Sequence, residues 1–340
     1  MPSNQAAFIP DLRKAIEVRE HAYTTPNAHE IVIETKSISL NPCDFAFQTL
    51  GPAIFPMIKY PCLPGEDVAG EVVEVGSDVK NFAVGDRVAG LSKEGFQKYP
   101  VLTECTTFKI PDGMSFEEAS VVPLGLSTAA SCLFHENYIG LQLPTTGTPA
   151  AATGKTVLIW GGSTSVGSNA VQLTAAAGYD VVATSSPRNF EYVKSLGASQ
   201  VFDYSASTIR EDLIGALKGK TLAGCVAIGG IGTKMTYEDV AGHCAAVLQA
   251  SEGRKFMATL KPMRNMAFEG VEAKFSNATL VTREPEFGMS VFKFVSEALS
   301  AGTYRALPKA EVVGKGLEGI QGGLDILKGG VSAKKLTINL

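Results

Sequence analysis

The sequence predicts an α/β protein whose second half is a doubly wound parallel sheet. The first observation is an apolar run at 157–160 that leads into a glycine-rich turn and then a helical pattern, which Gly178 ends before a second apolar run begins at Val181. Further strand candidates follow at Gln200–Phe202, Ala223–Ile228 and Arg254–Leu260. Strands that alternate with helices form parallel sheets, which need helices on both faces.

The glycine-rich turn is Gly-Gly-Ser-Thr-Ser-Val-Gly, residues 161–167. A strand, such a turn, a helix and a second strand within about 30 residues form the unit that binds dinucleotide pyrophosphate. Its glycines allow a tight turn, and the helix N-terminus offers free N–H groups to an anion. The alternative is an ordinary strand–turn–helix connection, because the spacing departs from GxGxxG. The predicted cofactor-binding residues here are Gly162, Ser163, Thr164, Ser165, Val166 and Gly167.

The end of the second strand favours NADPH over NADH. Sites that prefer NAD carry an Asp or Glu there for the ribose 2′-hydroxyl, whereas residues 184–188 contain no carboxylate. The hydroxyls of Ser185 and Ser186 and the guanidinium of Arg188 suit the 2′-phosphate of NADP. The alternative is a solvated loop.

Composition narrows the class of protein. The chain of 340 residues is long enough for two domains and is 45% hydrophobic. A net charge of −4 without a basic run argues against nucleic acid as a partner. No apolar stretch reaches membrane-spanning length, and the N-terminus lacks the shape of a signal peptide. Six scattered cysteines suggest reduced thiols. These features predict a cytoplasmic protein without a membrane partner.

The first third of the chain looks β-rich. Glu30–Ser39 has a strand pattern, and Ala69–Val75 and Arg87–Leu91 bracket a turn, as expected for a partly open barrel. The C-terminal part is predicted to return to this first domain. It should contain a helix from about Glu286 to Ala301, a strand at Glu311–Val313, a helix at Leu317–Lys328 and a strand at Lys335–Leu340. The expected ligand site is the cleft between the two domains.

Several ordered motifs carry a resemblance to a known family. They are LNPCD at 40–44, PGEDVAGEVVEVG at 64–76, FAVGDRV at 82–88, GLST at 125–128, the glycine turn and SAKK at 332–335. On these residues the chain resembles the medium-chain dehydrogenase/reductase superfamily. The resemblance implies a GroES-like catalytic domain with a partly open β-barrel, residues 1–124 and 279–340, and a Rossmann NADPH-binding domain, residues 125–278. NPCD, SSPRNF and VSAKK most resemble fungal trans-acting enoyl reductases and quinone-reductase-like proteins.

The chain departs from the zinc-dependent branch of that superfamily. There the three catalytic zinc ligands would fall at the positions of Asn41, Glu66 and Leu124, and Asn and Leu are not strong zinc ligands. The four-cysteine lobe for structural zinc is also missing, since residues 89–111 contain Cys105 alone. We therefore predict no metal. Without a Lewis acid, conjugate reduction of an activated C=C bond is favoured over reduction of C=O, with hydride delivered to Cβ and a proton to Cα.

Other positions were assigned to the cofactor with alternatives left open. Thr128 would support the nicotinamide or cap a helix. Lys194 would reach phosphate or be solvated, and Tyr204 would lie near the phosphate or adenosine or pack on the sheet. We expect Gly229, Gly230 and Ile231 to lie close to the nicotinamide ring; the alternative is an ordinary loop.

The proton donor is not identified, so the catalytic residues are unknown. Some relatives carry a tyrosine shortly after the NPxD segment, but residues 51–55 contain none and Tyr60 is displaced. Substrate-pocket candidates are Cys43, Phe47 and Tyr60, with core packing as the alternative. The expected substrate is a hydrophobic small molecule or an acyl group on a carrier, for which Lys59, Lys93 and Lys98 are candidate contacts. The expected oligomeric state is a monomer or homodimer.

Two other functions remain open at this point. One is a carbonyl reductase that uses ribose and side-chain hydroxyls in place of zinc. The other is a non-catalytic NADPH-binding sensor or subunit, which the missing donor tyrosine allows.

Overall fold

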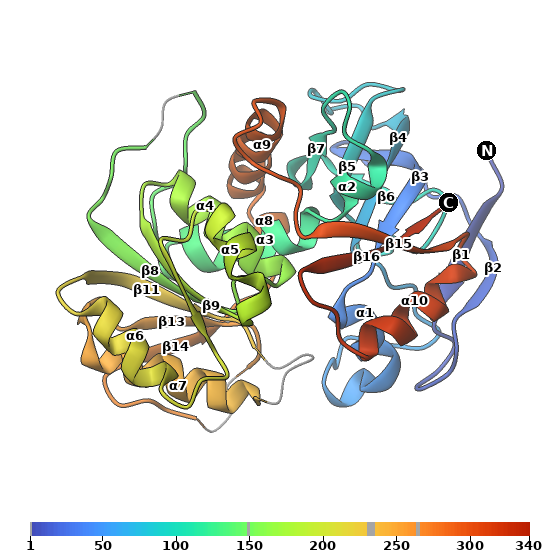
Figure 1. The fold of residues 1–340 in the computed structure, drawn as a ribbon. Helices are drawn as coiled ribbons and strands as arrows, with labels where there is room; N and C mark the ends of the chain where they lie inside the picture. Colours follow the sequence, from blue (N-terminus) through green and yellow to red (C-terminus); the bar gives the residue numbers. More distant parts are fainter. Residues whose placement is uncertain (1, 148–149, 230–234, 263–265) are drawn as a thin grey trace. The chain divides into compact units, whose positions relative to one another are not determined.

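The chain forms two compact units in the computed structural model, which describes residues 2–147, 150–229, 235–262 and 266–340. Unit 1 contains Met1–Leu124 and Gly288–Leu340, and unit 2 contains Gly125–Phe287 (Figure 1). The second boundary corrects the predicted one at 278/279, because α8 (Leu280–Arg283) and the residues after it pack within unit 2. There, Glu284 Oε1 lies 2.9 Å from His135 Nε2, and the Phe287 ring packs edge-on against His135.

The sheet of unit 2 is parallel throughout and has the order β10-β9-β8-β11-β13-β14, with β12 beside β11. This is the doubly wound order 3-2-1-4-5-6, so the predicted fold is confirmed. The order reverses between β8 and β11, the place where such sheets bind ligands. The strands are β8 (Lys155–Trp160), β9 (Asp180–Ser185), β10 (Gln200–Asp203), β11 (Thr221–Ala227), β12 (Glu252–Gly253), β13 (Phe256–Thr259) and β14 (Glu272–Phe275).

Helix α3 (Pro123–Phe134) precedes the first strand of unit 2. The helices that lie between its strands are α4 (Ser165–Ala176), α5 (Phe190–Ser195), α6 (Ile209–Leu217) and α7 (Tyr237–Ala250). Alternate residues of a strand point to opposite faces. Leu158 and Trp160 therefore share one face, where they belong to one buried core with Leu213 of α6 and Val240 of α7.

The main sheet of unit 1 is an open, mostly antiparallel sheet with the order β15-β16-β3-β4-β5-β7, and β6 pairs with β3. The predicted antiparallel pair around 69–75 and 87–91 is confirmed as β4 with β5. A separate pair, β1 (Asn4–Phe8) and β2 (Glu17–His21), forms a two-stranded sheet. The main strands are β3 (Glu30–Ser39), β4 (Asp67–Val75), β5 (Arg87–Leu91), β6 (Val101–Thr103), β7 (Thr107–Lys109), β15 (Lys309–Lys315) and β16 (Lys334–Asn339).

The C-terminal segment completes unit 1, as predicted. Strand β16 pairs antiparallel with β3, with Ile338 opposite Ile38, and both side chains are fully buried. Leu324 of α10 packs in the same core. The helices of this unit are α1 (Pro42–Thr49), α2 (Phe116–Ser120), α9 (Pro285–Ser300) and α10 (Gly319–Lys328).

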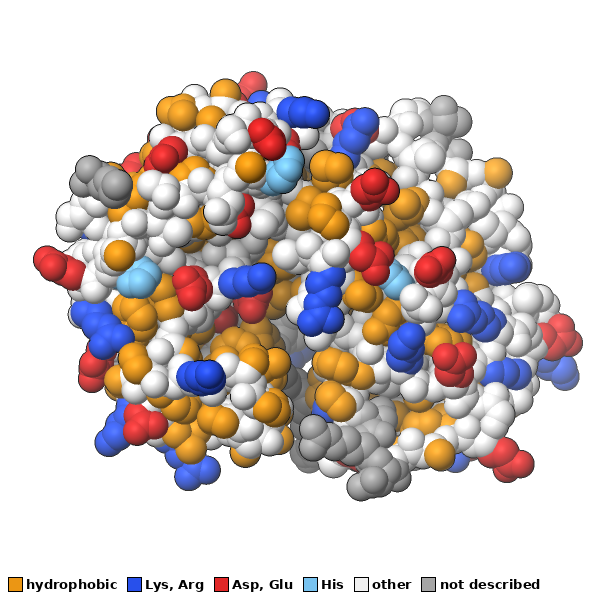
Figure 2. Space-filling model, turned by 180° about the vertical axis from the view of Figure 1, so that it is seen from behind, with side chains coloured by type: hydrophobic (Ala, Val, Ile, Leu, Met, Phe, Trp, Pro, Cys, Tyr) orange, Lys and Arg blue, Asp and Glu red, His pale blue; other side chains and the backbone are white. Residues whose placement is uncertain are grey.

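The surface carries charges of both signs. On the face drawn in Figure 2, Lys and Arg side chains are interspersed with Asp and Glu, and hydrophobic side chains lie between them. Within the described ranges, none of the helices combines the length and apolar character needed to span a bilayer.

Candidate functional site

The glycine-rich turn of unit 2 follows β8, and two of its backbone N–H groups bind Thr184 near the end of β9. Gly161 has a φ of +86°, a conformation that favours glycine. Its N–H donates to Thr184 Oγ1 at 3.1 Å, and the Gly162 N–H donates to the Thr184 carbonyl at 2.8 Å. The turn is therefore fixed at the point where the sheet order reverses.

The start of α4 supplies an anion site beside this turn. Thr164 caps the helix by accepting the Gly167 N–H at 2.9 Å. A Cβ atom at Gly167 would collide with the Gly161 carbonyl, so this approach requires glycine. The Ser165 hydroxyl is buried at the helix start without a hydrogen-bond partner. A free hydroxyl and the first N–H groups of a 12-residue helix together fit a phosphate.

The residues predicted for the 2′-phosphate are partly brought together. Ser186 Oγ lies 2.9 Å from Tyr204 OH, and Arg188, two residues after Ser186 in the chain, is exposed. Ser185 differs from the expectation in its environment, because its side chain is buried and its hydroxyl donates to the Ser186 carbonyl at 3.1 Å. Lys194 is exposed and forms an ion pair with Glu191 at 2.9 Å.

The other predicted cofactor residues lie in different parts of unit 2. Thr128 is buried in α3. Gly229 follows β11, and a Cβ atom there would lie 2.6 Å from Val240 Cγ2. Gly230 and Ile231 lie outside the described residues.

Three polar side chains that the sequence did not assign to the site support the turn. Thr184 accepts the Gly161 N–H, as described above. The Asn189 amide donates to Ser163 Oγ at 3.3 Å, and Tyr192 OH lies 2.8 Å from Ser168 Oγ. All three lie within ten residues after the middle of β9. The presence of polar residues at and after the end of that strand is the sequence signal that could have identified them as supports of the turn.

Unit 1 contains a buried ion pair at the start of β4. The Lys335 ammonium of β16 lies 2.9 Å from Asp67 Oδ2, and the two side chains are 5% and 0% exposed. Asp67 also accepts the Asn41 side-chain amide at 2.9 Å and the Leu124 N–H at 2.6 Å. These three donors compensate the charge of the buried carboxylate.

Asn41 links this ion pair to helix α1. Its Oδ1 accepts the Lys335 ammonium at 2.5 Å, and its backbone N–H donates to Asp44 Oδ2 at 2.7 Å. The Asn41 side chain is buried, and both its Oδ1 and its Nδ2 atoms form hydrogen bonds, with Lys335 and Asp67 respectively.

Two further carboxyls near the ion pair hold protons more tightly than usual. Desolvation and the neighbouring Asp67 charge raise the pKa of Asp44 to about 7. Desolvation, with the charges of Asp44 and Asp67, raises the pKa of Glu66 to about 8. Burial likewise raises the pKa of the Cys43 thiol, the predicted pocket residue beside Asp44, well above its usual value.

The other predicted pocket residues contact each other. Tyr60 OH donates to the Phe47 carbonyl at 2.6 Å, and the Phe47 ring packs edge-on against Phe55. Because its hydroxyl is occupied within the protein, Tyr60 has a structural role in this arrangement.

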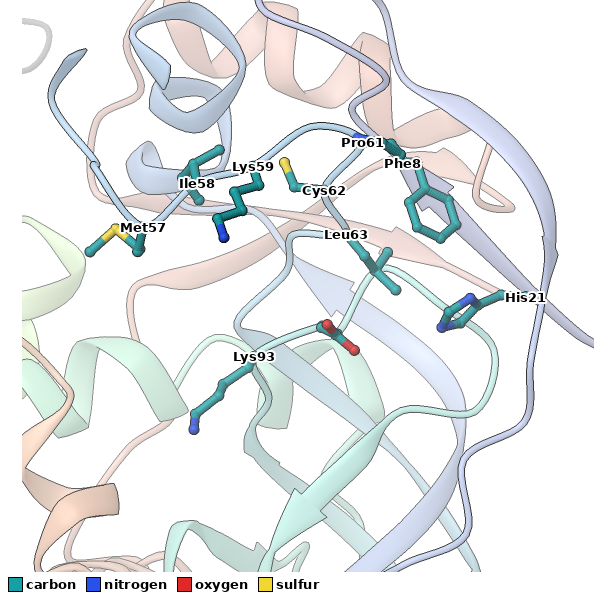
Figure 3. Close-up of a pocket in the computed structure, with 10 residues that line it drawn as sticks. Phe8, His21, Met57, Ile58, Lys59, Pro61, Cys62, Leu63 and Lys93 are labelled. Carbon is teal, nitrogen blue, oxygen red and sulfur yellow. The ribbon is translucent and has the colours of Figure 1, made fainter. Parts of the chain in front are cut away.

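An open pocket of about 310 Å³ lies next to Tyr60 in the chain. Figure 3 shows Lys59 and Lys93 on the same side of this pocket as Met57, with Phe8 and His21 on the other side. The residues that line it are Phe8, His21, Met57, Ile58, Lys59, Pro61, Cys62, Leu63, Lys93 and Glu94.

Comparison with known proteins identifies the family. Residues 27–124 match the model of the alcohol dehydrogenase GroES-like domain. The chain is 45% identical to "Dehydrogenase azaJ" of Aspergillus niger over the whole of both chains. It belongs to the medium-chain dehydrogenase/reductase superfamily.

Two further members extend this comparison. "Trans-enoyl reductase himH" of Aspergillus japonicus is 37% identical over 99% of this chain and 97% of its own. The crystal structure of a Pseudomonas syringae quinone oxidoreductase has a TM-score of 0.76 and 20% identity, with 99% and 100% of the two chains covered. The protein is thus an oxidoreductase of the medium-chain superfamily, as its motifs predicted.

The residues of unit 2 fit the nicotinamide dinucleotide that this superfamily uses. Cβ atoms at Gly161, Gly162 and Gly167 would contact neighbouring protein atoms, so these glycines let the turn pack tightly against the sheet and the start of α4. The unpartnered Ser165 hydroxyl would give a pyrophosphate a hydrogen-bond donor. A bound nicotinamide dinucleotide supplies or accepts a hydride.

Two of the three positions that hold zinc in other medium-chain enzymes do not fit the metal in this chain, which leaves the Glu66 carboxyl alone. The Asn41 amide is bonded to Lys335 and Asp67, and the Leu124 side chain has no donor atom. A buried ammonium at 2.5 Å from Asn41 would also repel a cation. In the part of the chain that the structure describes, no three His, Cys, Asp or Glu side chains are grouped as a metal site.

Replacing Gly167 with alanine should weaken NADPH binding at least about tenfold, because the new Cβ atom would push the Gly161 carbonyl away from the helix start. Fluorescence titration with NADPH measures this. Gly242→Ala is the matched control, since a Cβ atom on this residue of α7 meets nothing within 4 Å. Equal affinity in the Gly167→Ala variant and the wild type would contradict the proposed role of the turn.

Replacing Lys335 with methionine should lower the free energy of unfolding by about 3–5 kcal/mol, because the Asp67 carboxylate is left buried without its counter-charge. Adding Asp67→Asn should restore part of that loss by removing the uncompensated charge. Urea denaturation of the single and double variants measures both effects. A Lys335→Met variant as stable as the wild type would show that the pair contributes little.

Proposed function

We propose that this protein is an NADPH-dependent reductase of activated C=C bonds that works without zinc. Its substrate would be an enoyl thioester, an enone or a quinone, with hydride added at Cβ and a proton at Cα. The observation that carries the proposal is the Asn41–Lys335–Asp67 network, which occupies one of the positions where other members of the family bind zinc. The name of the 37% identical himH as a trans-enoyl reductase supports the same reaction.

The charge arrangement supports alkene reduction over ketone reduction. A ketone needs its developing alkoxide stabilised by a Lewis acid or a strong donor. Conjugate addition of hydride spreads the charge into an enolate, which hydrogen bonds stabilise more readily. Unit 1 offers carboxyls whose pKa values are raised to about 7 in Asp44 and about 8 in Glu66, and the protonated form of such a group can donate a hydrogen bond and also a proton.

The preference for NADPH is supported by the end of β9. The hydroxyls of Ser186 and Tyr204 lie 2.9 Å apart, with the Arg188 guanidinium exposed to solvent. Two hydroxyls and a guanidinium match the oxygens of a 2′-phosphate.

The pocket of unit 1 supports an anionic or carrier-bound substrate. Its apolar side chains suit an acyl chain, and Lys59 and Lys93 suit a phosphate such as that of a phosphopantetheine arm. A hydrophobic small molecule uses the same apolar surface without the lysines.

Turnover tests the proposal directly. The protein is expected to oxidise NADPH faster than NADH in the presence of a short enoyl thioester or a cyclic enone, and to form the saturated carbonyl product. Mass spectrometry and NMR identify the product. An allylic alcohol would indicate a carbonyl reductase, and NADPH binding without turnover of any activated alkene would indicate a non-catalytic role.

Replacing Arg188 with alanine should raise the dissociation constant for NADPH about 10- to 100-fold, because one charge-assisted bond to phosphate contributes about 1.5–3 kcal/mol. The affinity for NADH should stay unchanged, since it lacks the 2′-phosphate. Titration of both cofactors gives the ratio, and Arg210→Ala, an exposed arginine of α6, is the control. A parallel loss for both cofactors would argue against a 2′-phosphate contact.

A further inference from the structure

The backbone around Glu66 is held rigidly. The Glu66 carbonyl accepts the Ser92 N–H at 2.7 Å, and Gly65 accepts the Gly95 N–H at 2.8 Å. Gly65 has a φ of +105°, and a Cβ atom there would collide with Phe96. The carboxyl of the next residue therefore projects from a fixed segment, as a preorganised functional group does.

Among the three clustered acidic residues, Glu66 is the one that is partly exposed. Asp44 and Asp67 are fully buried, whereas Glu66 is half-buried. Its carboxyl makes no side-chain hydrogen bond with the described residues, and its charged neighbours are Asp44, Asp67 and Lys93. Lys93 also lines the open pocket of unit 1 together with Leu63. Lys93 thus connects Glu66 electrostatically to the lining of that pocket.

We propose that Glu66 is the acid that protonates Cα of the substrate after hydride addition to Cβ. This inference rests on the proposed alkene reductase and supplies the donor that the sequence did not reveal. Hydride addition at Cβ leaves an enolate. The enolate electron pair then takes the Glu66 proton and forms the Cα–H bond, while the O–H bond of the carboxyl breaks. The resulting carboxylate is reprotonated by water.

The surrounding charges explain why Glu66 carries a proton near neutral pH. The Asp67 carboxylate binds Lys335, the Asn41 amide and the Leu124 N–H, and its negative charge opposes ionisation of Glu66. Asp44 acts in the same sense, and Lys93 opposes both. The pKa of about 8 places Glu66 in the range where a general acid is both protonated and able to donate.

The other groups of the cluster are poorer donors. The Cys43 thiol lies near the same carboxyls, and their charges together with burial raise its pKa well above the usual value. Asp44 is fully buried and its Oδ2 accepts the Asn41 N–H. Tyr60 donates to the Phe47 carbonyl.

The test follows where deuterium enters the product. Wild-type protein that reduces an α-substituted enoyl thioester with NADPH in D₂O should place one deuterium at Cα in a single configuration. Glu66→Gln should lower kcat by about 10²-fold or more and give both configurations, because solvent then reaches either face of the enolate. Glu66→Asp should keep the single configuration with an intermediate rate, since it retains a carboxyl.

The pH profile gives a second readout. The acid must be protonated to act, so the wild-type kcat should be full below pH 8 and fall as the pH rises through about 8. This fall should disappear in Glu66→Gln. Besides burial, the charges that set the pKa of Glu66 are those of Asp44, Asp67 and Lys93. Cys43 and Lys335 belong to the same cluster, since Glu66 and Lys335 act on Cys43 and Lys335 acts on Asp44.

Control variants and measurements distinguish loss of the Glu66 proton donor from misfolding of the variant and from absence of the reductase activity. Glu71→Gln makes the same chemical change at an exposed residue of β4 and should match the wild type in every readout. Melting temperature and NADPH affinity show whether each variant is folded. A Glu66→Gln variant with wild-type rate, pH profile and product configuration would overturn the assignment while leaving the reductase intact. A wild-type protein that binds NADPH and reduces no activated alkene would overturn both.

Discussion

The ion pair between Asp67 and Lys335 is the interaction on which the candidate site of unit 1 depends. It joins the start of β4 to β16, and through Asn41 and the Leu124 N–H it also holds the entry to α1 and the start of α3. A buried carboxylate without these partners would be costly. The carboxylate charge is therefore available to the site because the C-terminal strand returns and pairs with β3.

The fixed charge of Asp67 has a chemical consequence for its neighbours. Two carboxyls close to an ionised carboxylate, in surroundings with little water, bind their protons more tightly. The cluster around Asn41 and Glu66 thus contains a buried ammonium and carboxyls with raised pKa values. For the proposed reaction, such groups suit hydrogen-bond donation and proton transfer.

Unit 2 works by a different physical means, since its site is made mainly of backbone. The Gly161 N–H, the Thr164 cap and the start of α4 are positioned by local hydrogen bonds and by close approaches that exclude a side chain at Gly167. Backbone donors serve the pyrophosphate, which every nicotinamide dinucleotide carries. In the proposed preference for NADPH, a few side chains after β9, such as Ser186 and Arg188, would discriminate between the cofactors.

The sequence by itself determined the doubly wound sheet, the glycine turn and the family, because these depend on residues close together in the chain. Tertiary structure decided what the side chains do. It buried the Ser185 hydroxyl against the Ser186 carbonyl, and it occupied the Tyr60 hydroxyl with the Phe47 carbonyl. Lys335 meets Asn41 across 294 residues of chain. A local sequence pattern carries no information on such a long-range contact. The charge state of a buried group depends on all the groups packed around it, and these come from distant parts of the chain.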